Sequence, residues 1–275
     1  MTAPALTVPA VTAVADRRRL GGVAQAASDT SAVAWRNLVA YRRVPQLLVF
    51  STIQPVVFVL MFRYVFGGAI RITGESYVNY LMPGIFAQTV VFGSMGTAIG
   101  LATDRGAGLI ERFRSLPMAR SAVLAGRTLA DLVRNLFVVV LMLAVGFAVG
   151  FRPHDSTVIT VLAGVLLVVL FGYAGSWIFA TVGLVARDAE TAQAMSFPVL
   201  APLVFASTAF VPLRSMPEWL QPFAQHQPVS ATVDAVRVLM TGGATTRPLL
   251  KALAWIIGIV VVFAPLAVRR YRRTA

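Results

Sequence analysis

Few residues in this sequence could carry catalytic chemistry. The chain has no cysteine and only two histidines, His154 and His226, so a thiolate or histidine metal site is not expected. The patterns G-x-x-x-x-G-K-[ST], G-x-S-x-G and H-E-x-x-H do not occur, which argues against a phosphate loop, a serine hydrolase and a zinc protease. Asp131 lies between Arg127 and Arg134 at helical spacing and can pair with either. We therefore expect no catalytic residue, no metal and no cofactor in the chain itself.

The most distinctive polar segment is the stretch 104–117, which reads DRGAGLIERFRSLP. Leu109, Phe113 and Leu116 recur at i, i+4 and i+7, which predicts one apolar face on a short helix. Pro117 should end that helix, because proline lacks the N–H that the next turn needs. The pattern fits either an ordinary helix at the membrane surface or an element that a partner protein pushes. The charged residues expected away from the apolar face are Glu111, Arg112 and Arg114.

The composition indicates that these polar residues belong to a membrane protein. Hydrophobic residues make up 57% of the 275, and charged residues only 13%, against about 25% in ordinary soluble domains. A span takes about 20 mostly apolar residues, and its backbone polar groups must be paired within a helix. The expected fold class is all-α, a polytopic membrane protein with six transmembrane helices. The predicted spans are residues 47–70, 78–103, 122–151, 157–186, 191–213 and 249–268.

Two kinds of segment precede the first span. Residues 1–27 are rich in Ala, Thr, Val and Pro and are predicted to be a flexible cytoplasmic tail, with residues 28–275 forming the transmembrane domain. Residues 29–43 are predicted to form an amphipathic helix in the membrane interface, although they could simply extend the first span. The residues that define its apolar and polar sides are Trp35, Arg36, Leu38 and Val39.

The distribution of basic residues predicts the orientation. With six spans, 17 of the 24 Lys and Arg residues fall on the side of both termini and 7 on the other side. Basic residues favour the cytoplasmic side, so both termini are expected in the cytoplasm of a cell (plasma) membrane protein. The net charge of +13 is then explained by topology and anionic lipid, and no nucleic-acid partner is expected. Residues 210–237, with four prolines, are predicted to form short re-entrant helices in the outer leaflet.

Two motifs resemble those of a known family. The cytoplasmic segment 111–120 reads ERFRSLPMAR, and the outer segment 217–228 follows P-x-W-L-x-P-F-x-x-x-x-P. In this order they resemble ABC-2 type permeases, particularly the daunorubicin/doxorubicin-resistance type of actinobacteria, from about residue 30 to the C-terminus. The resemblance implies a separate subunit that binds ATP and Mg, a second permease subunit (identical or a sibling), and residues 29–43 as the interface helix. It also implies a coupling helix with Glu111, Arg112, Phe113, Arg114, Leu116 and Pro117.

The expected function is the membrane subunit of an ATP-driven exporter of amphipathic drugs, lipids or polyketides, and related branches export polysaccharides. An ion-coupled carrier is the main alternative; it needs ionisable groups near the membrane midplane, and we identify none in the sequence. A membrane-embedded enzyme is a further alternative. The residues that bind substrate are not identified. Gly93, Gly96 and Gly100 fit either close helix packing or a dimer seam.

Overall fold

The computed structural model describes residues 22–43, 45–67, 76–114, 118, 120–154 and 156–273. All regular structure in these ranges is helical, as predicted. The elements are α2 (Gly22–Arg43), α3 (Pro45–Leu60), the π-helix η1 (Met61–Phe66), α4 (Tyr77–Gly106), α5 (Leu109–Arg114), α6 (Arg120–Val149), α7 (Val158–Gly183), α8 (Ala189–Phe205), the 3₁₀-helix η2 (Leu213–Ser215), α9 (Gln221–His226), α10 (Pro228–Thr241) and α11 (Thr246–Arg273).

Four helices in the described ranges are long and apolar enough to cross a membrane, namely α4, α6, α7 and α11. They coincide with the second, third, fourth and sixth predicted spans. The first predicted span falls on α3 and η1, and the fifth falls on α8. With 17 residues, α8 is about 25 Å long, and it ends at Phe205 rather than near residue 213. The chain is therefore a multi-pass helical membrane protein.

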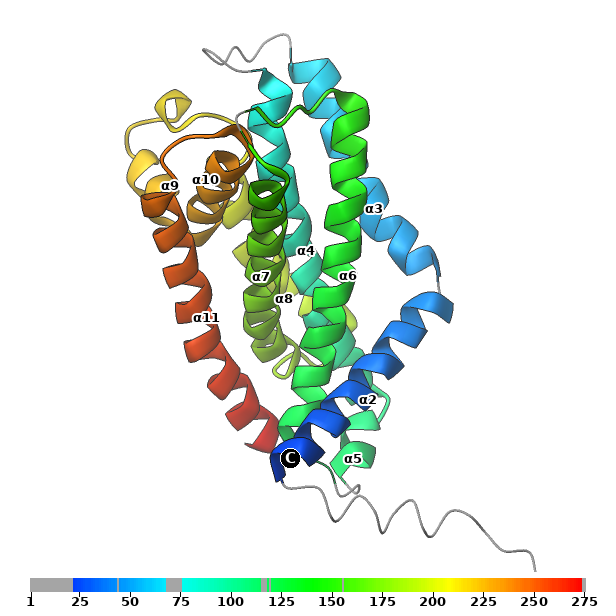
Figure 1. The fold of residues 1–275 in the computed structure, drawn as a ribbon. Coiled ribbons are helices and arrows are strands. Elements are labelled where there is room, and N and C mark those ends of the chain that lie inside the picture. Colours follow the sequence, from blue (N-terminus) through cyan, green and yellow to red (C-terminus); the bar gives the residue numbers. More distant parts are fainter. Residues whose placement is uncertain are drawn as a thin grey trace, which may run out of the picture.

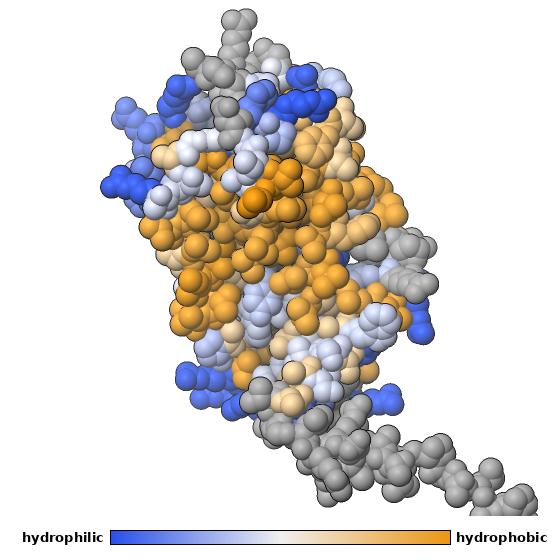
Figure 2. All heavy atoms as spheres, in the orientation of Figure 1, coloured by the Kyte–Doolittle hydropathy of each residue, from blue (hydrophilic) through white to orange (hydrophobic). Residues whose placement is uncertain are grey.

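On the face that Figure 2 shows, apolar residues cover the middle of the molecule, and polar residues gather at both ends. Large apolar side chains on α7 and α11 point outward, among them Ile159, Leu166, Ile257 and Val261. A soluble protein rarely exposes so wide an apolar surface. In a bilayer this surface contacts lipid tails, and the polar ends contact headgroups and water.

Helix α4 forms the centre of the bundle and contacts α6, α7, α8 and α10 (Figure 1). Its side chains Leu81, Ile85 and Phe86 are fully buried. Two glycines allow other segments to approach very closely. A Cβ on Gly84 would collide with the backbone of Ala209, and a Cβ on Gly183 of α7 would collide with α4. Small residues at such crossings let the backbones of membrane helices pack closely.

The connections divide between the two ends of the bundle (Figure 1). One end holds α2, α5, the turn between α7 and α8, and the C-terminal end of α11. The opposite end holds the α6–α7 connection, η2, α9 and α10. Short helices were expected in segment 210–237, and they are present, with α10 buried against α4, α7 and α11. On α10, Arg237 stacks on the Tyr80 ring at 3.8 Å and donates to the carbonyl of Thr208 at 2.8 Å.

Candidate functional site: an interface helix, a short helix and a buried ionic network

Helix α2 lies along the first half of α6. It begins at Gly22, so residues 22–27, assigned above to a flexible tail, are helical; residues 1–21 lie outside the described ranges. Its buried side includes Val33, which fits against Gly126 of α6 because a Cβ on that glycine would collide with it. Trp35 points away from the bundle and is 68% exposed. The helix thus has one side on α6 and another that carries tryptophan outward.

The residues predicted to define the two sides of α2 differ in burial. Trp35 is exposed, and Leu38 and Val39 are half-buried. The side of α2 that packs on α6 carries Val33 and Ala34, which the sequence pattern did not single out. Arg36 leaves the helix on a different side, as expected, and its guanidinium reaches α4. The packed side and the predicted apolar side are therefore distinct.

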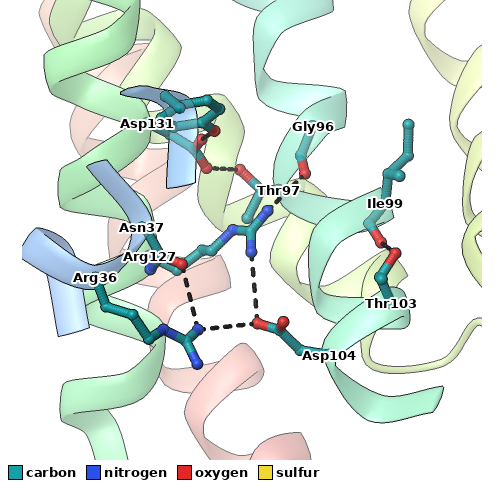
Figure 3. Close-up of polar contacts among 10 residues, drawn as sticks. Arg36, Asn37, Gly96, Thr97, Ile99, Thr103, Asp104, Arg127 and Asp131 are labelled. Atoms are coloured by element: carbon teal, nitrogen blue, oxygen red, sulfur yellow. Dashed lines mark hydrogen bonds and ion pairs between the residues drawn. The ribbon is translucent and has the colours of Figure 1, made fainter. Parts of the chain in front are cut away.

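Asp104, near the C-terminal end of α4, receives two guanidinium groups (Figure 3). Arg36 Nη2 of α2 lies 3.3 Å from its carboxylate, and Arg127 Nη1 of α6 lies 3.5 Å away. Arg127 also donates through Nη2 to the Gly96 carbonyl at 3.2 Å. One carboxylate therefore joins α2, α4 and α6 at the end of the bundle where α5 lies.

A second carboxylate, Asp131 of α6, lies deeper and is fully buried. It accepts hydrogen bonds from Tyr41 of α2 at 3.0 Å and from Thr97 of α4 at 2.5 Å (Figure 3). Arg134 lies 3.9 Å from it on the next turn of α6. Burial, together with the Asp131 charge, raises the pKa of the Tyr41 phenol, so the hydroxyl stays protonated and donates.

The helix bounds give the position of these charges along α6. Helix α6 starts at Arg120, so Asp131 is the twelfth and Arg134 the fifteenth of its 30 residues. Its uncharged stretch follows them, over residues 135–149. The charges were expected at the start of the third span, and the expectation that no ionisable group lies near the membrane midplane stays a prediction.

The glycines of α4 explain how α6 arginines fit inside the bundle. A Cβ on Gly100 would collide with the Arg127 guanidinium, and a Cβ on Gly96 would collide with that of Arg134. Gly93 faces Arg134 in the same way, and its carbonyl accepts a hydrogen bond from Arg134 Nη2. Within the chain, the glycine row accordingly makes room for guanidinium groups rather than for close backbone contact, and the dimer seam stays a prediction.

Helix α5 covers residues 109–114 and follows a sharp turn at Gly108, whose φ of 68° suits glycine. The short helix predicted in segment 104–117 is therefore present. Among the α5 side chains that the structure describes, Ile110, which the expected apolar face omits, is buried, and Leu109 is half-buried. Ile110 belongs to an apolar cluster that includes Leu101 of α4, Leu124 of α6, Trp177 of α7 and Tyr271 of α11.

The predicted coupling residues are only partly described. Glu111, Phe113 and Arg114 lie in α5, but their side chains are outside the described part of the structure, and so are Leu116 and Pro117 altogether. Arg112 is exposed at this end of the bundle.

A further arginine connects α4 to the turn between α7 and α8. Arg105 Nη1 donates to the carbonyl of Leu184 at 3.1 Å and to that of Ala186 at 3.4 Å. These two carbonyls follow the last turn of α7, where backbone oxygens lack helical partners. The described residues contain no group of three or more His, Asp or Glu side chains that could hold a metal ion. Ion pairs, hydrogen bonds and apolar contacts thus join α2, α4, α5, α6, α7 and α11 at this end of the bundle.

Comparison with known proteins identifies the family. The model of the ABC-2 type transporter family matches residues 28–241. A daunorubicin resistance ABC transporter permease protein of Streptomyces coeruleorubidus is 37% identical over 249 residues, which cover 90% of this chain and 88% of the relative. A probable doxorubicin resistance ABC transporter permease protein of Mycobacterium tuberculosis is 34% identical over 227 residues, 82% of this chain and 81% of the relative. A putative transport permease of Cyanophora paradoxa is 26% identical over 211 residues, 74% and 71% of the two chains. The chain therefore belongs to the ABC-2 type transporter family of membrane permeases.

Proposed function

We propose that this chain is the membrane subunit of an exporter that moves amphipathic drugs, lipids or polyketides out of the cytoplasm, driven by ATP that a separate subunit hydrolyses. The relatives named for daunorubicin and doxorubicin resistance support this substrate class. The sequence lacks a phosphate-loop pattern, which supports a partner subunit that binds ATP and Mg. A second permease subunit, identical or a sibling, completes the complex.

The observation that carries the proposal is the position of α5. Ile110 anchors this short helix in an apolar cluster with side chains of α4, α6, α7 and α11, all four of the long apolar helices. A force on the exposed side of α5 would therefore reach each of them. The ordinary surface-helix interpretation does not require so many elements to meet at one residue.

Two further sets of contacts would transmit a movement of α5 to other helices. Arg105 connects α4 with the α7–α8 turn, and Asp104 connects α4 with α2 and α6. In the proposed cycle, ATP binding closes the partner dimer, and α5 shifts with it. The permease pair then alternates between two arrangements, biased by the different contacts that the ATP-bound partner makes in each.

The proposed topology has six spans, with α3–η1 and α8 crossing the membrane beside the four long helices, and with η2, α9 and α10 at the outer face. Both ends of the described chain lie at the α5 end of the bundle, which supports an even number of spans. Basic residues of the α11 C-terminal turn lie at this end, which supports a cytoplasmic location under the positive-inside rule. In this arrangement α2 lies in the cytoplasmic membrane interface.

Asp131 favours a second candidate, an ion-coupled carrier. A fully buried carboxylate inside a span is typical of proton and cation relays. Arg134, Tyr41 and Thr97 already engage it, however, and this pattern suits a structural ion pair. Transport that follows the proton gradient and ignores ATP would favour the carrier.

Alanine variants of α5 test the proposal. Glu111→Ala and Arg112→Ala should leave the protein in the membrane and the partner able to hydrolyse ATP. Export of daunorubicin should fall about tenfold or more, because movement of the partner no longer reaches the spans. The matched control is Arg247→Ala, which removes an exposed arginine at the opposite end of the bundle. Unchanged export in both α5 variants would refute α5 as the coupling element.

A further inference from the structure

A cavity of about 340 Å³ lies among α3, α4 and α6. Cavities that bind drug-sized molecules measure roughly 300–1,000 Å³ and combine apolar walls with a few polar groups. Here the apolar wall includes Phe92, Met95 and Val138, and the polar groups include Gln88 and Arg134. Gln88 is the twelfth of the 30 residues of α4, and Arg134 is the fifteenth of the 30 in α6. The cavity thus lies near the middle of both helices, counted in residues.

Gln88 is the cavity residue that most strongly indicates a ligand. Its side chain is only 2% exposed, and its amide oxygen Oε1 is buried with no hydrogen-bond donor among the described residues. An unpaired buried amide is unfavourable in a protein and more so at membrane depth, where water does not replace the missing partner. Polar groups inside membrane spans often mark functional sites. A ligand in the adjoining cavity would supply the missing partner.

Arg134 provides the second polar contact. Its hydrogen bonds, to the Gly93 carbonyl and the Asn135 amide oxygen, both come from Nη2. Nη1 and Nε have no acceptor within the described ranges of the chain. Asp131 already faces the guanidinium at 3.9 Å and balances its charge. An additional anion is therefore not required, whereas an uncharged oxygen could accept from the free N–H groups.

We infer that this cavity is a binding site inside a single permease subunit for amphipathic ring compounds that carry carbonyl or hydroxyl oxygens on an apolar body. A ligand hydroxyl donates to Gln88 Oε1, a ligand oxygen accepts from Arg134, and the rings contact Phe92, Met95 and Val138. The inference names a site for the substrate class proposed above and rests on that proposal. It places the site between α3, α4 and α6 of one chain rather than between two subunits.

Two uncharged probes with the same ring skeleton test the site. The binding of 9-anthracenemethanol, whose hydroxyl can donate and accept, and of anthracene is measured by equilibrium dialysis against the purified chain in nanodiscs. The wild-type chain should bind the oxygenated probe about tenfold more tightly or better, a difference that one or two hydrogen bonds account for. Gln88→Leu should remove most of this preference while leaving anthracene binding unchanged. Met95→Trp, which fills the cavity, should weaken the binding of both probes.

The melting temperature of Gln88→Leu separates a binding role for Gln88 from a purely structural one. If Gln88 serves binding, Gln88→Leu should leave the melting temperature unchanged or raise it, because its amide oxygen has no partner in the described chain. A purely structural role predicts a lowered melting temperature. Gln193→Leu is the matched control, because it makes the same change at an exposed position of α8. A lowered melting temperature with an unchanged probe preference would overturn the inference, and so would equal binding of both probes by the wild-type chain.

An export assay distinguishes a failure of the proposed binding site from a failure of the proposed exporter function. ATP-driven export of daunorubicin is measured for the wild-type chain with its ATP-binding partner in the same membranes. If the wild-type complex exports daunorubicin and Gln88→Leu changes neither probe binding nor export, the cavity is not the binding site, but the exporter function stands. A wild-type chain that prefers the oxygenated probe through Gln88 but supports no export keeps the binding site and refutes the exporter.

Discussion

Neutralising Asp131 should destabilise the protein far more than neutralising Asp104, although both carboxylates face arginines. Asp131 is fully buried and balances Arg134, whose side chain is only 9% exposed. Asp131→Asn keeps the shape and one acceptor oxygen for Tyr41 or Thr97, but it leaves the guanidinium without a counter-charge. Removing one partner of a buried pair costs about 3–5 kcal/mol. Hydrogen bonds between membrane helices average about 0.6 kcal/mol, so the charge dominates, and a loss of about 3 kcal/mol is expected.

The comparison with Asp104 makes this prediction specific. Asp104 is partly open to solvent, and its two arginine partners lie 3.3 and 3.5 Å away. Ion pairs that water can reach contribute about 0–1 kcal/mol, so Asp104→Asn should cost about 1 kcal/mol. The free energy of unfolding can be measured by titrating SDS into mixed micelles and following the fluorescence of the four tryptophans.

A double substitution tests whether the unpaired charge causes the loss of stability. Asp131→Asn with Arg134→Gln removes both charges and should recover most of the stability that the single change loses. Equal losses for Asp131→Asn and Asp104→Asn would refute the reasoning. A loss of unfolding free energy below about 1 kcal/mol for Asp131→Asn would also refute it. Leaving the Arg134 guanidinium without its counter-charge would then cost no more than breaking an ion pair exposed to water.

Two further substitutions probe the end of the bundle opposite α5. Gly84→Ala should lower the melting temperature by several degrees, because the new Cβ would collide with the backbone of Ala209; a melting curve matching wild type would show that the contact is loose. Arg237→Lys should cost about 1–3 kcal/mol, because lysine cannot stack on Tyr80 while holding Asp234 and the Thr208 carbonyl together. SDS titration measures that loss, and a fully stable lysine variant would mean that charge alone suffices there.

The long spans could be predicted from the sequence because hydrocarbon thickness constrains them directly. Uncharged runs of about 20 residues marked α4, α6, α7 and α11, and their positions agree with the structure. Helix α8 was predicted too long, since the apolar residues after Phe205 continue into a turn and η2. Hydropathy records apolar character and does not register where a helix ends.

The site was harder to predict because it depends on contacts between distant segments. The spacing in segment 104–117 indicated a helix but did not single out Ile110, which packs in a cluster with side chains of α4, α6, α7 and α11. Asp104 could be recognised only as a charge at the end of a span. Nothing in the sequence signalled that Gly96 and Gly100 would accommodate arginines of α6, because glycine in a span is equally typical of backbone contact.

Reconstitution of this chain with an ATP-binding partner in proteoliposomes tests the central claim most directly. Daunorubicin movement is measured with ATP and no proton gradient, and then with a proton gradient and no ATP. We predict movement that requires ATP, disappears when the partner subunit is omitted, and is insensitive to dissipation of the gradient. Movement that persists without ATP and the partner but follows the proton gradient would contradict the account and would favour an ion-coupled carrier built around Asp131.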